Sequence, residues 1–157
     1  MSRELDLINA GEELLLKARA AARRSRERTL ELTGSWEGPP KLVLVVEDDP
    51  ATREMLGTVL RQQGYAVEAA ADGREALARL RGGLRPAGIV LDLVMPRMDG
   101  RAFRAEQRRD RDLAGIPVVV CSGELDADQE AEDLGAAACV QKPILFAELL
   151  RALWRHC

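Results

Sequence analysis

Acidic, hydroxyl and ammonium side chains follow four short apolar runs of the chain. If these runs are parallel strands of one sheet, the side chains that follow them meet at one edge, where open sheets of this kind bind ligands. Such a group of side chains is suited to binding a divalent metal and transferring a phosphoryl group. The runs and the residues after them are 41–46 before Glu47 and Asp48, 87–91 before Asp92, 116–121 before Ser122, and 137–141 before Lys142.

The carboxylates at this edge predict a magnesium site. Two carboxylates about 4 Å apart repel each other by roughly 4 kcal/mol at an effective dielectric constant of about 20, unless a cation compensates their charge. Mg²⁺ does so well, because it binds a few carboxylates and keeps its other positions for water and phosphate oxygens. We expect Asp48 to bind the metal directly, Glu47 to bind it directly or through water, and the Val94 carbonyl to be a backbone ligand.

Asp92 is the residue we expect to act as the nucleophile. A carboxylate that attacks phosphorus gives an acyl phosphate, and carboxylates are known covalent nucleophiles. The metal and Lys142 would stabilise charge on the transferred group, which is most of what phosphoryl transfer asks of a protein. The Ser122 hydroxyl would turn toward the same group.

A simpler interpretation of the acidic run is helix capping. An acidic residue before a helix often caps it and complements its dipole, and Asp49 followed by Pro50 fits this pattern. A Lys-Pro pair is likewise usual in a solvated turn. We favour the site because four such features follow four apolar runs in the right order.

Strands and helices alternate along residues 41–157. This alternation predicts an α/β fold: a doubly wound, five-stranded parallel sheet with five surrounding helices on its two faces. Asp99 is placed to cap the helix that ends at about residue 110. Besides the four runs above, we expect a strand at 65–69 and helices at 50–63, 74–81, 100–110, 125–134 and 145–156.

Composition bounds the classes of function. The chain has 157 residues, of which 46% are apolar and 31% charged, enough for one packed domain and an appendage. A net charge of -3 and 3% aromatic residues argue against a nucleic-acid partner. No apolar run is long enough to cross a bilayer and no signal peptide is evident, so we expect no membrane partner and a cytoplasmic location.

The cysteines do not predict a metal site or a disulfide. Cys121, Cys139 and Cys157 are odd in number and lack paired spacing. We interpret the first two as small buried hydrophobic residues and the third as a terminal thiol.

An N-terminal helical extension at 1–33 and a linker at 34–40 precede the predicted domain at 41–157. Ile8, Leu15 and Ala22 recur at a spacing of seven, a weak heptad. Residues 1–33 carry seven basic and six acidic side chains, a net of +1, which indicates a solvated face with paired charges. The apolar seam suggests a helix that forms a homodimer or docks on a partner.

Residues 41–156 resemble the receiver domain of bacterial response regulators. The stretches that carry the resemblance are Val-Leu-Val-Val-Glu-Asp-Asp-Pro at 43–50, Asp-x-x-Met-Pro-x-Met-Asp-Gly at 92–100, Val-Cys-Ser-Gly at 120–123, and Gly135-Ala136 leading to Lys142-Pro143. The stretch at 92–100 is highly specific, and the ordered set is more so.

The resemblance implies that Asp92 is phosphorylated from a histidine phosphate on a sensor histidine kinase or a histidine phosphotransfer protein, and signals to an unknown downstream protein by conformational change. It implies that Ser122 and Lys142 contact the phosphoryl group. The Mg²⁺ ligands that it implies are Glu47, Asp48, Asp92 and the carbonyl of Val94. It also implies sheet order 2-1-3-4-5, a cis Lys142-Pro143 bond, and an output face made by helix 4, strand 5 and helix 5 of the domain.

Two departures from the family pattern fall on that output face. The family usually carries Tyr or Phe where this chain has Cys139, which has no ring to swing inward. The stretch from Ser122 to Gly135 is also a little shorter than usual, so we expect a clipped fourth helix or a tighter loop before it.

Three hypotheses follow. The first is a phosphorylatable signalling module that modifies only itself and is not an enzyme, standing alone or cut from a larger sensor protein, with no room for a DNA-binding domain. The second is a docking scaffold of receiver shape that works without phosphorylation, which Cys139 favours. The third is a Mg²⁺-dependent phosphatase for outside substrates, which lacks an evident second acid–base residue.

Overall fold

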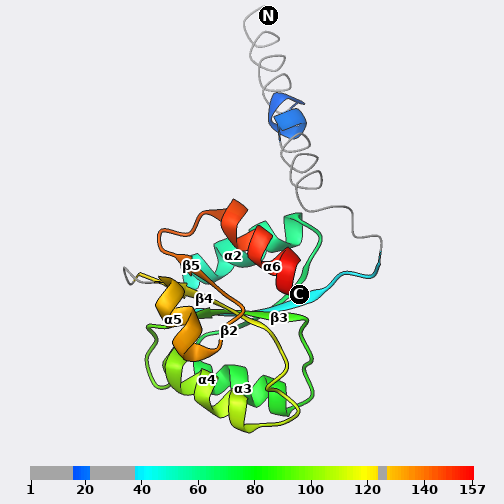
Figure 1. The fold of residues 1–157 in the computed structure, drawn as a ribbon. Coiled ribbons are helices and arrows are strands. Elements are labelled where there is room, and N and C mark those ends of the chain that lie inside the picture. Colours follow the sequence, from blue (N-terminus) through cyan, green and yellow to red (C-terminus); the bar gives the residue numbers. More distant parts are fainter. Residues whose placement is uncertain (1–15, 22–37, 124–126) are drawn as a thin grey trace, which may run out of the picture. The chain divides into compact units, whose positions relative to one another are not determined.

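The sheet of the domain is five-stranded and parallel. A computed structural model describes residues 16–21, 38–123 and 127–157, and residues 38–157 form one compact unit. The strand order is β2-β1-β3-β4-β5, which confirms the predicted order (Figure 1). Asp92 and Ser122 are the last residues of their strands rather than the first residues of the loops. The strands are β1 (Leu42–Val46), β2 (Ala66–Ala70), β3 (Gly88–Asp92), β4 (Val118–Ser122) and β5 (Ala138–Gln141).

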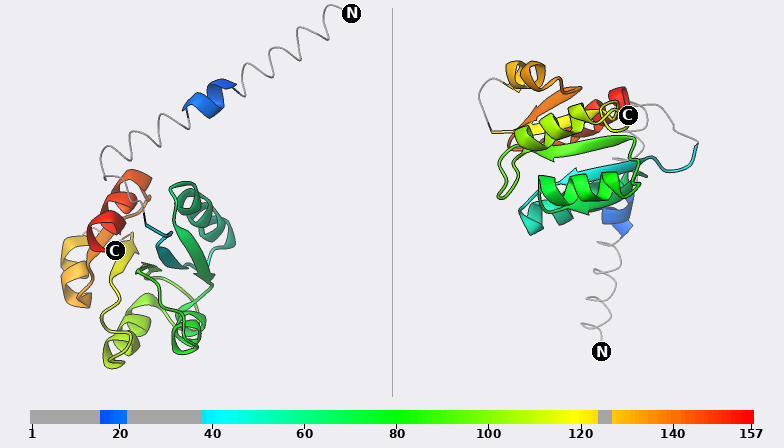
Figure 2. Two further views of the ribbon diagram at one scale, coloured as in Figure 1. Left: turned by 90° about the vertical axis from the view of Figure 1, so that its right-hand side faces the viewer. Right: turned by 90° about the horizontal axis from the view of Figure 1, so that it is seen from below.

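A helix follows each strand, as the alternation of the sequence predicts. Helices α2 and α6 cover one face of the sheet, while α3, α4 and α5 cover the other (Figures 1 and 2). None of the helices in the described ranges is long and apolar enough to cross a membrane. The five helices are α2 (Pro50–Gln62), α3 (Gly73–Arg81), α4 (Gly100–Arg109), α5 (Ala127–Leu134) and α6 (Phe146–His156).

Part of the N-terminal extension is also described. Residues 16–21 are helical, and the rest of the extension and residues 34–37 of the predicted linker lie outside the described residues. The predicted dimerising or docking helix therefore stays a prediction. The same holds for the predicted boundaries at 33 and 40, and for the predicted helix start at residue 125, which lies outside the described residues.

The strands bury side chains on both faces, which explains why they are apolar throughout. Successive side chains of a strand point to opposite faces, so Leu44 and Leu91 lie on the α3–α5 face and Val45 and Val90 on the α2–α6 face. Each fully buried Val or Leu side chain stabilises the fold by about 1.5–3 kcal/mol. Phe103 of α4 is fully buried on the α3–α5 face. The two cores hold the strand ends, and so the loops after them, in fixed positions.

Aspartates cap three of the helices. Asp49 accepts a hydrogen bond from the Thr52 amide at 3.0 Å, and Asp99 accepts one from the Ala102 amide at 2.8 Å. Both caps were predicted. Asp72 caps α3 in the same way, with the Glu75 amide at 2.9 Å. Capping therefore accounts for Asp49 but not for the two acids before it.

The structure agrees with part of the prediction for the burial and bonding of the cysteines. All three are free thiols, and Cys121 is buried in the α2–α6 core. The prediction that Cys139 is buried is wrong, because it is only partly covered. Strand β5 lies at the edge of the sheet, so Cys139 has a neighbouring strand on one side only.

Candidate phosphoryl and metal site

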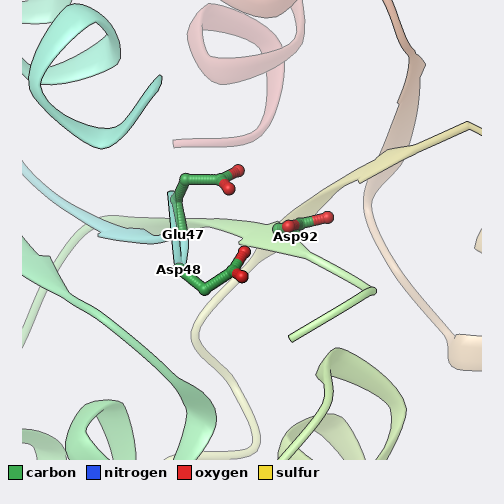
Figure 3. Close-up of side chains that lie close together, drawn as sticks. All are labelled: Glu47, Asp48 and Asp92. Atoms are coloured by element: carbon green, nitrogen blue, oxygen red, sulfur yellow. The ribbon is translucent and has the colours of Figure 1, made fainter. Parts of the chain in front are cut away.

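Three carboxylates meet at the carboxyl edge of the two central strands. Oxygen atoms of Glu47, Asp48 and Asp92 all lie within 4.8 Å of one another (Figure 3). Strands β1 and β3 are hydrogen-bonded neighbours, with Val46 opposite Leu91, so the residues that follow this pair are adjacent. The structure thus brings together the three side chains that the sequence predicts as metal ligands.

Burial and a neighbouring charge disfavour the ionised form of Glu47 in this cluster. Glu47 and Asp92 are only 3% and 4% exposed. Burial, followed by the charge of Asp92, raises the pKa of Glu47 to about 7 from an ordinary 4.5. The Asp49 amide, 3.2 Å from Glu47 Oε1, opposes this shift only in part. Three carboxylates with one pKa near neutrality form a donor set that a divalent cation would suit.

Lys142 reaches this cluster from the loop after β5. Its Nζ atom lies 3.0 Å from Oδ1 of Asp92 and 3.9 Å from Oε2 of Glu47. Burial lowers the pKa of Lys142, but the hydrogen bond and charge of Asp92 outweigh burial, so the pKa lies above its ordinary value. The bond to Pro143 is cis, as the resemblance implies. Lys142 thus presents a fixed positive charge beside the carboxylate predicted as nucleophile.

The loop after β3 fixes the Asp92 carboxylate. The Val94 amide donates to Oδ1 of Asp92 at 3.3 Å, and the Gly100 amide donates to the Leu93 carbonyl at 3.0 Å. Val94 is 76% exposed, two residues beyond Asp92 in this loop. Its predicted role as a carbonyl ligand stays a prediction.

Ser122 ends β4 and lies beside the Lys142 loop. The Lys142 amide donates to the Ser122 carbonyl at 2.7 Å, and Asp92 is paired with Cys121 in the sheet. The Ser122 hydroxyl, however, donates to Oε2 of Glu130 at 2.6 Å. Sequence analysis missed Glu130, although an acidic first turn in the helix after Ser122 was a signal that could have drawn attention to it.

Arg53 is a second residue that sequence analysis missed. From α2 it donates through Nη1 to the carbonyls of Glu47 at 2.9 Å and Asp48 at 3.3 Å. It therefore fixes the backbone that carries both acids. A signal was present, because a cation near the N-terminus of a helix opposes the helix dipole and needs another reason to be there.

The fold and this set of residues define a class of protein. Residues 43–154 match the family model of the response regulator receiver domain. The chain belongs to this family, the receiver domains of two-component signalling systems.

Curated relatives are similar to this chain over part of their own length. The response regulator MprA of Mycolicibacterium vanbaalenii is 40% identical over 120 residues, which cover 74% of this chain and 52% of the relative. MprA of Mycobacterium avium is 40% identical over 117 residues, covering 73% of this chain and 51% of the relative. The chain thus spans about half the length of these curated relatives.

Solved structures agree with the fold. The chemotaxis response regulator CheY4 of Vibrio cholerae superposes with a TM-score of 0.69 at 34% identity, covering 75% of this chain and 99% of that protein. The signal receiver domain of a histidine kinase from Syntrophus aciditrophicus gives a TM-score of 0.63 at 31% identity, covering 73% of this chain and 90% of the other. Similar domains therefore occur both in response regulators and in kinases.

Proposed function

We propose that this domain accepts a phosphoryl group on Asp92, in a Mg²⁺-dependent reaction, from a histidine kinase or a histidine phosphotransfer protein. The observation that carries the proposal is the Lys142 ammonium 3.0 Å from a buried aspartate that shares its site with two further acids. An aspartate with a purely structural role would need only the ammonium as its partner. The two additional carboxylates are expected where a metal cation also binds and offsets their charge and that of a phosphoryl group.

The metal ligands in this proposal are Glu47, Asp48, Asp92 and the Val94 carbonyl. When bound, Mg²⁺ would neutralise charge on the phosphoryl oxygens. The donor set supports this choice, because carboxylate and carbonyl oxygens are the ligands Mg²⁺ prefers. Burial and then the charge of Asp92 raise the pKa of Glu47, and a bound cation would favour its ionised form.

The transfer step involves Asp92 and Lys142. The donor is a phosphohistidine, and an oxygen of Asp92 attacks its phosphorus. A new oxygen–phosphorus bond forms while the nitrogen–phosphorus bond breaks, and the electron pair of the broken bond stays on the imidazole. Oδ1 accepts hydrogen bonds from Lys142 and from the Val94 amide, so we assign the attack to Oδ2. Lys142 then stabilises the charge of the phosphoryl oxygens.

The product is a modified form of the protein itself, so the domain is a signalling module rather than an enzyme. Receipt of the phosphoryl group changes the charge beside β3 and β4, and the resulting conformational change is passed to a downstream protein. The alternative is a docking scaffold that works without phosphorylation. Cys139 favours it, since a thiol stands where the family usually carries an aromatic ring.

Intact mass spectrometry tests the proposal. The full chain, incubated with Mg²⁺ and phosphoramidate, should gain one phosphoryl group and lose it on standing. Asp92→Asn should gain none, whereas Asp112→Asn, a change at an exposed residue between α4 and β4, should behave like the wild type. A folded wild type that stays unmodified would support the scaffold. Turnover of an external phosphate ester beyond one equivalent would support the phosphatase instead.

A further inference from the structure

Three side chains from three elements form a hydrogen-bonded chain beside the phosphoryl site. Ser122 at the end of β4 donates its hydroxyl proton to Oε2 of Glu130 on α5 at 2.6 Å. Oε1 of the same carboxylate pairs with Nη2 of Arg101 on α4. The Glu130 side chain is only 10% exposed, while Arg101 is 50% exposed. The carboxylate is thus held between a buried hydroxyl and a guanidinium anchor at the surface.

The direction of the Ser122 side chain follows from the strand. Side chains alternate along β4, and Val120 lies in the α3–α5 core while Cys121 lies in the α2–α6 core. Ser122 therefore belongs to the α3–α5 face, where Glu130 meets it. A serine hydroxyl has a single proton to donate. As long as Glu130 accepts this proton, the hydroxyl cannot donate it to a phosphoryl oxygen.

The hydrogen bond is of a strong kind. An O–H···O distance of 2.6 Å lies in the range of hydrogen bonds from a hydroxyl to a carboxylate. The Arg101 guanidinium holds the other oxygen of this carboxylate. Ser122 gives up a strong partner when it turns to another acceptor.

We propose that Glu130 is a positioning residue that withholds the Ser122 hydroxyl until a phosphoryl group competes for it, and that Arg101 anchors Glu130 for this task. The inference rests on the proposed phosphorylation of Asp92. A phosphoryl group carries nearly two negative charges and three acceptor oxygens, so it can take the proton that Glu130 holds. Glu130 then keeps Arg101 as its partner.

The exchange reaches beyond Ser122. Helix α5, which carries Glu130, packs against β5, and burial, followed by the charges of Glu130 and Asp128, raises the pKa of the Cys139 thiol to about 11. The side chains involved therefore connect the site to α4, α5 and β5. Movement of Ser122 removes one partner of Glu130 and leaves its pairing with Arg101 on α4.

Phosphorylation kinetics of Glu130→Gln provide the test. The amide keeps the shape of the side chain but removes the charge that strengthens the bond, so Ser122 turns more easily toward the transferring group. We expect full-length Glu130→Gln to be phosphorylated by phosphoramidate and Mg²⁺ about 3- to 10-fold faster than the wild type. Glu132→Gln, an exposed change on the same helix, should keep the wild-type rate.

A double-mutant cycle separates release of the hydroxyl from a simple change in charge. In a Ser122→Ala background, Glu130→Gln should have no effect on the rate, because there is no hydroxyl to release. A rate increase that persists in Ser122→Ala would assign the effect to charge alone and overturn the proposal. A Glu130→Gln rate equal to or below that of the wild type would overturn it too.

Arg101→Gln provides an independent variant if Glu130→Gln does not fold. It removes the anchor and leaves Glu130 in place, so we expect a smaller rate increase that again requires Ser122. An unchanged rate in Arg101→Gln would contradict the anchoring role.

The results distinguish failure of this inference from failure of the proposed function. A folded wild type that accepts no phosphoryl group would contradict both. A wild type that is phosphorylated, with variants that keep its rate, would contradict only this inference.

Discussion

Lys142 and Asp92 are 50 residues apart in the sequence, yet their side chains are joined by a hydrogen bond of 3.0 Å. Asp92 ends β3 and Lys142 follows β5, and these strands are not neighbours, since β4 lies between them. The lysine side chain therefore reaches over the end of β4 to the aspartate. This places the ammonium beside two carboxylates, 3.0 Å from Asp92 and 3.9 Å from Glu47.

Lys142→Met should abolish most of the phosphorylation. The substitution removes the charge that faces Asp92 and keeps much of the side-chain length. Loss of one preorganised stabilising donor typically slows a reaction by about 10²–10³-fold. Initial rates from intact mass, with Mg²⁺ and phosphoramidate, measure this. Lys41→Met is the matched control at the opposite end of the sheet, and a Lys142→Met rate within about threefold of it would contradict the role of Lys142.

The stability of the metal-free protein should fall as pH rises from about 4.5 to about 7. Glu47 has its folded pKa at about 7 and its ordinary value at 4.5, so the unfolded chain loses its proton first. The loss approaches about 3 kcal/mol above pH 7, at 1.36 kcal/mol per pKa unit. Urea unfolding in EDTA between pH 4.5 and 8 measures it.

Glu47→Gln should flatten that profile. The amide does not titrate, so the variant should be more stable than the wild type at pH 8 and lack most of the change between pH 4.5 and 7. Glu54→Gln, at an exposed position of α2, should retain the wild-type profile. Parallel profiles for the wild type and Glu47→Gln would show that burial of Glu47 does not set the pH dependence.

Gly100→Ala should destabilise the fold and distort the loop that presents Asp92. A Cβ atom at this position would lie 2.5 Å from the Asp92 carbonyl oxygen and 2.8 Å from Cα of Leu93. Both are backbone atoms, so the loop itself would have to shift, at a cost of about 1–3 kcal/mol. Gly115→Ala is the control, since no atom lies within 4 Å of its added methyl. Equal urea midpoints for the two variants would contradict this prediction.

Arg104→Met should destabilise the junction of α4 and α5. The guanidinium is buried and donates to the carbonyls of Leu134 at 3.0 Å and Gly135 at 2.7 Å, and to the Gln107 side chain at 2.8 Å. Its removal leaves these acceptors unpaired, which should cost about 2–4 kcal/mol. Arg108→Met, at an exposed position of α4, should change the free energy of unfolding by less than about 0.5 kcal/mol. Similar losses in both variants would argue against the buried bonds as the cause.

Patterns within single segments predicted the sheet and the carboxyl-edge position of the acids. The apolar run 42–46 is short and rich in valine, which favours a strand covered on both faces, and short β–α units leave few arrangements. The caps at Asp49 and Asp99 depend on residues three apart, so they too are visible locally. The order of these segments along the chain was therefore enough to predict a parallel sheet with the acids at its carboxyl edge.

Contacts between helices could not be predicted in this way. Arg101 and Glu130 meet from different helices, 29 residues apart, through long side chains that could reach several partners. Arg53 points back along its own helix to carbonyls whose positions depend on the turn before it. The partial exposure of Cys139 depends on which strand lies at the sheet edge. Each of these facts requires the packing of whole elements.

The site is distributed over the sheet, and this couples ligand binding to folding. Glu47 and Asp48 follow β1, Asp92 ends β3 and Lys142 follows β5, so no single segment carries enough of the site to bind by itself. A partly unfolded chain that has lost β5 also loses the ammonium. Any cation held by the assembled acids thus shifts the equilibrium toward the native state, by about 2.7 kcal/mol at a hundred times its dissociation constant. Cellular cation levels would then influence how long the domain survives proteolysis.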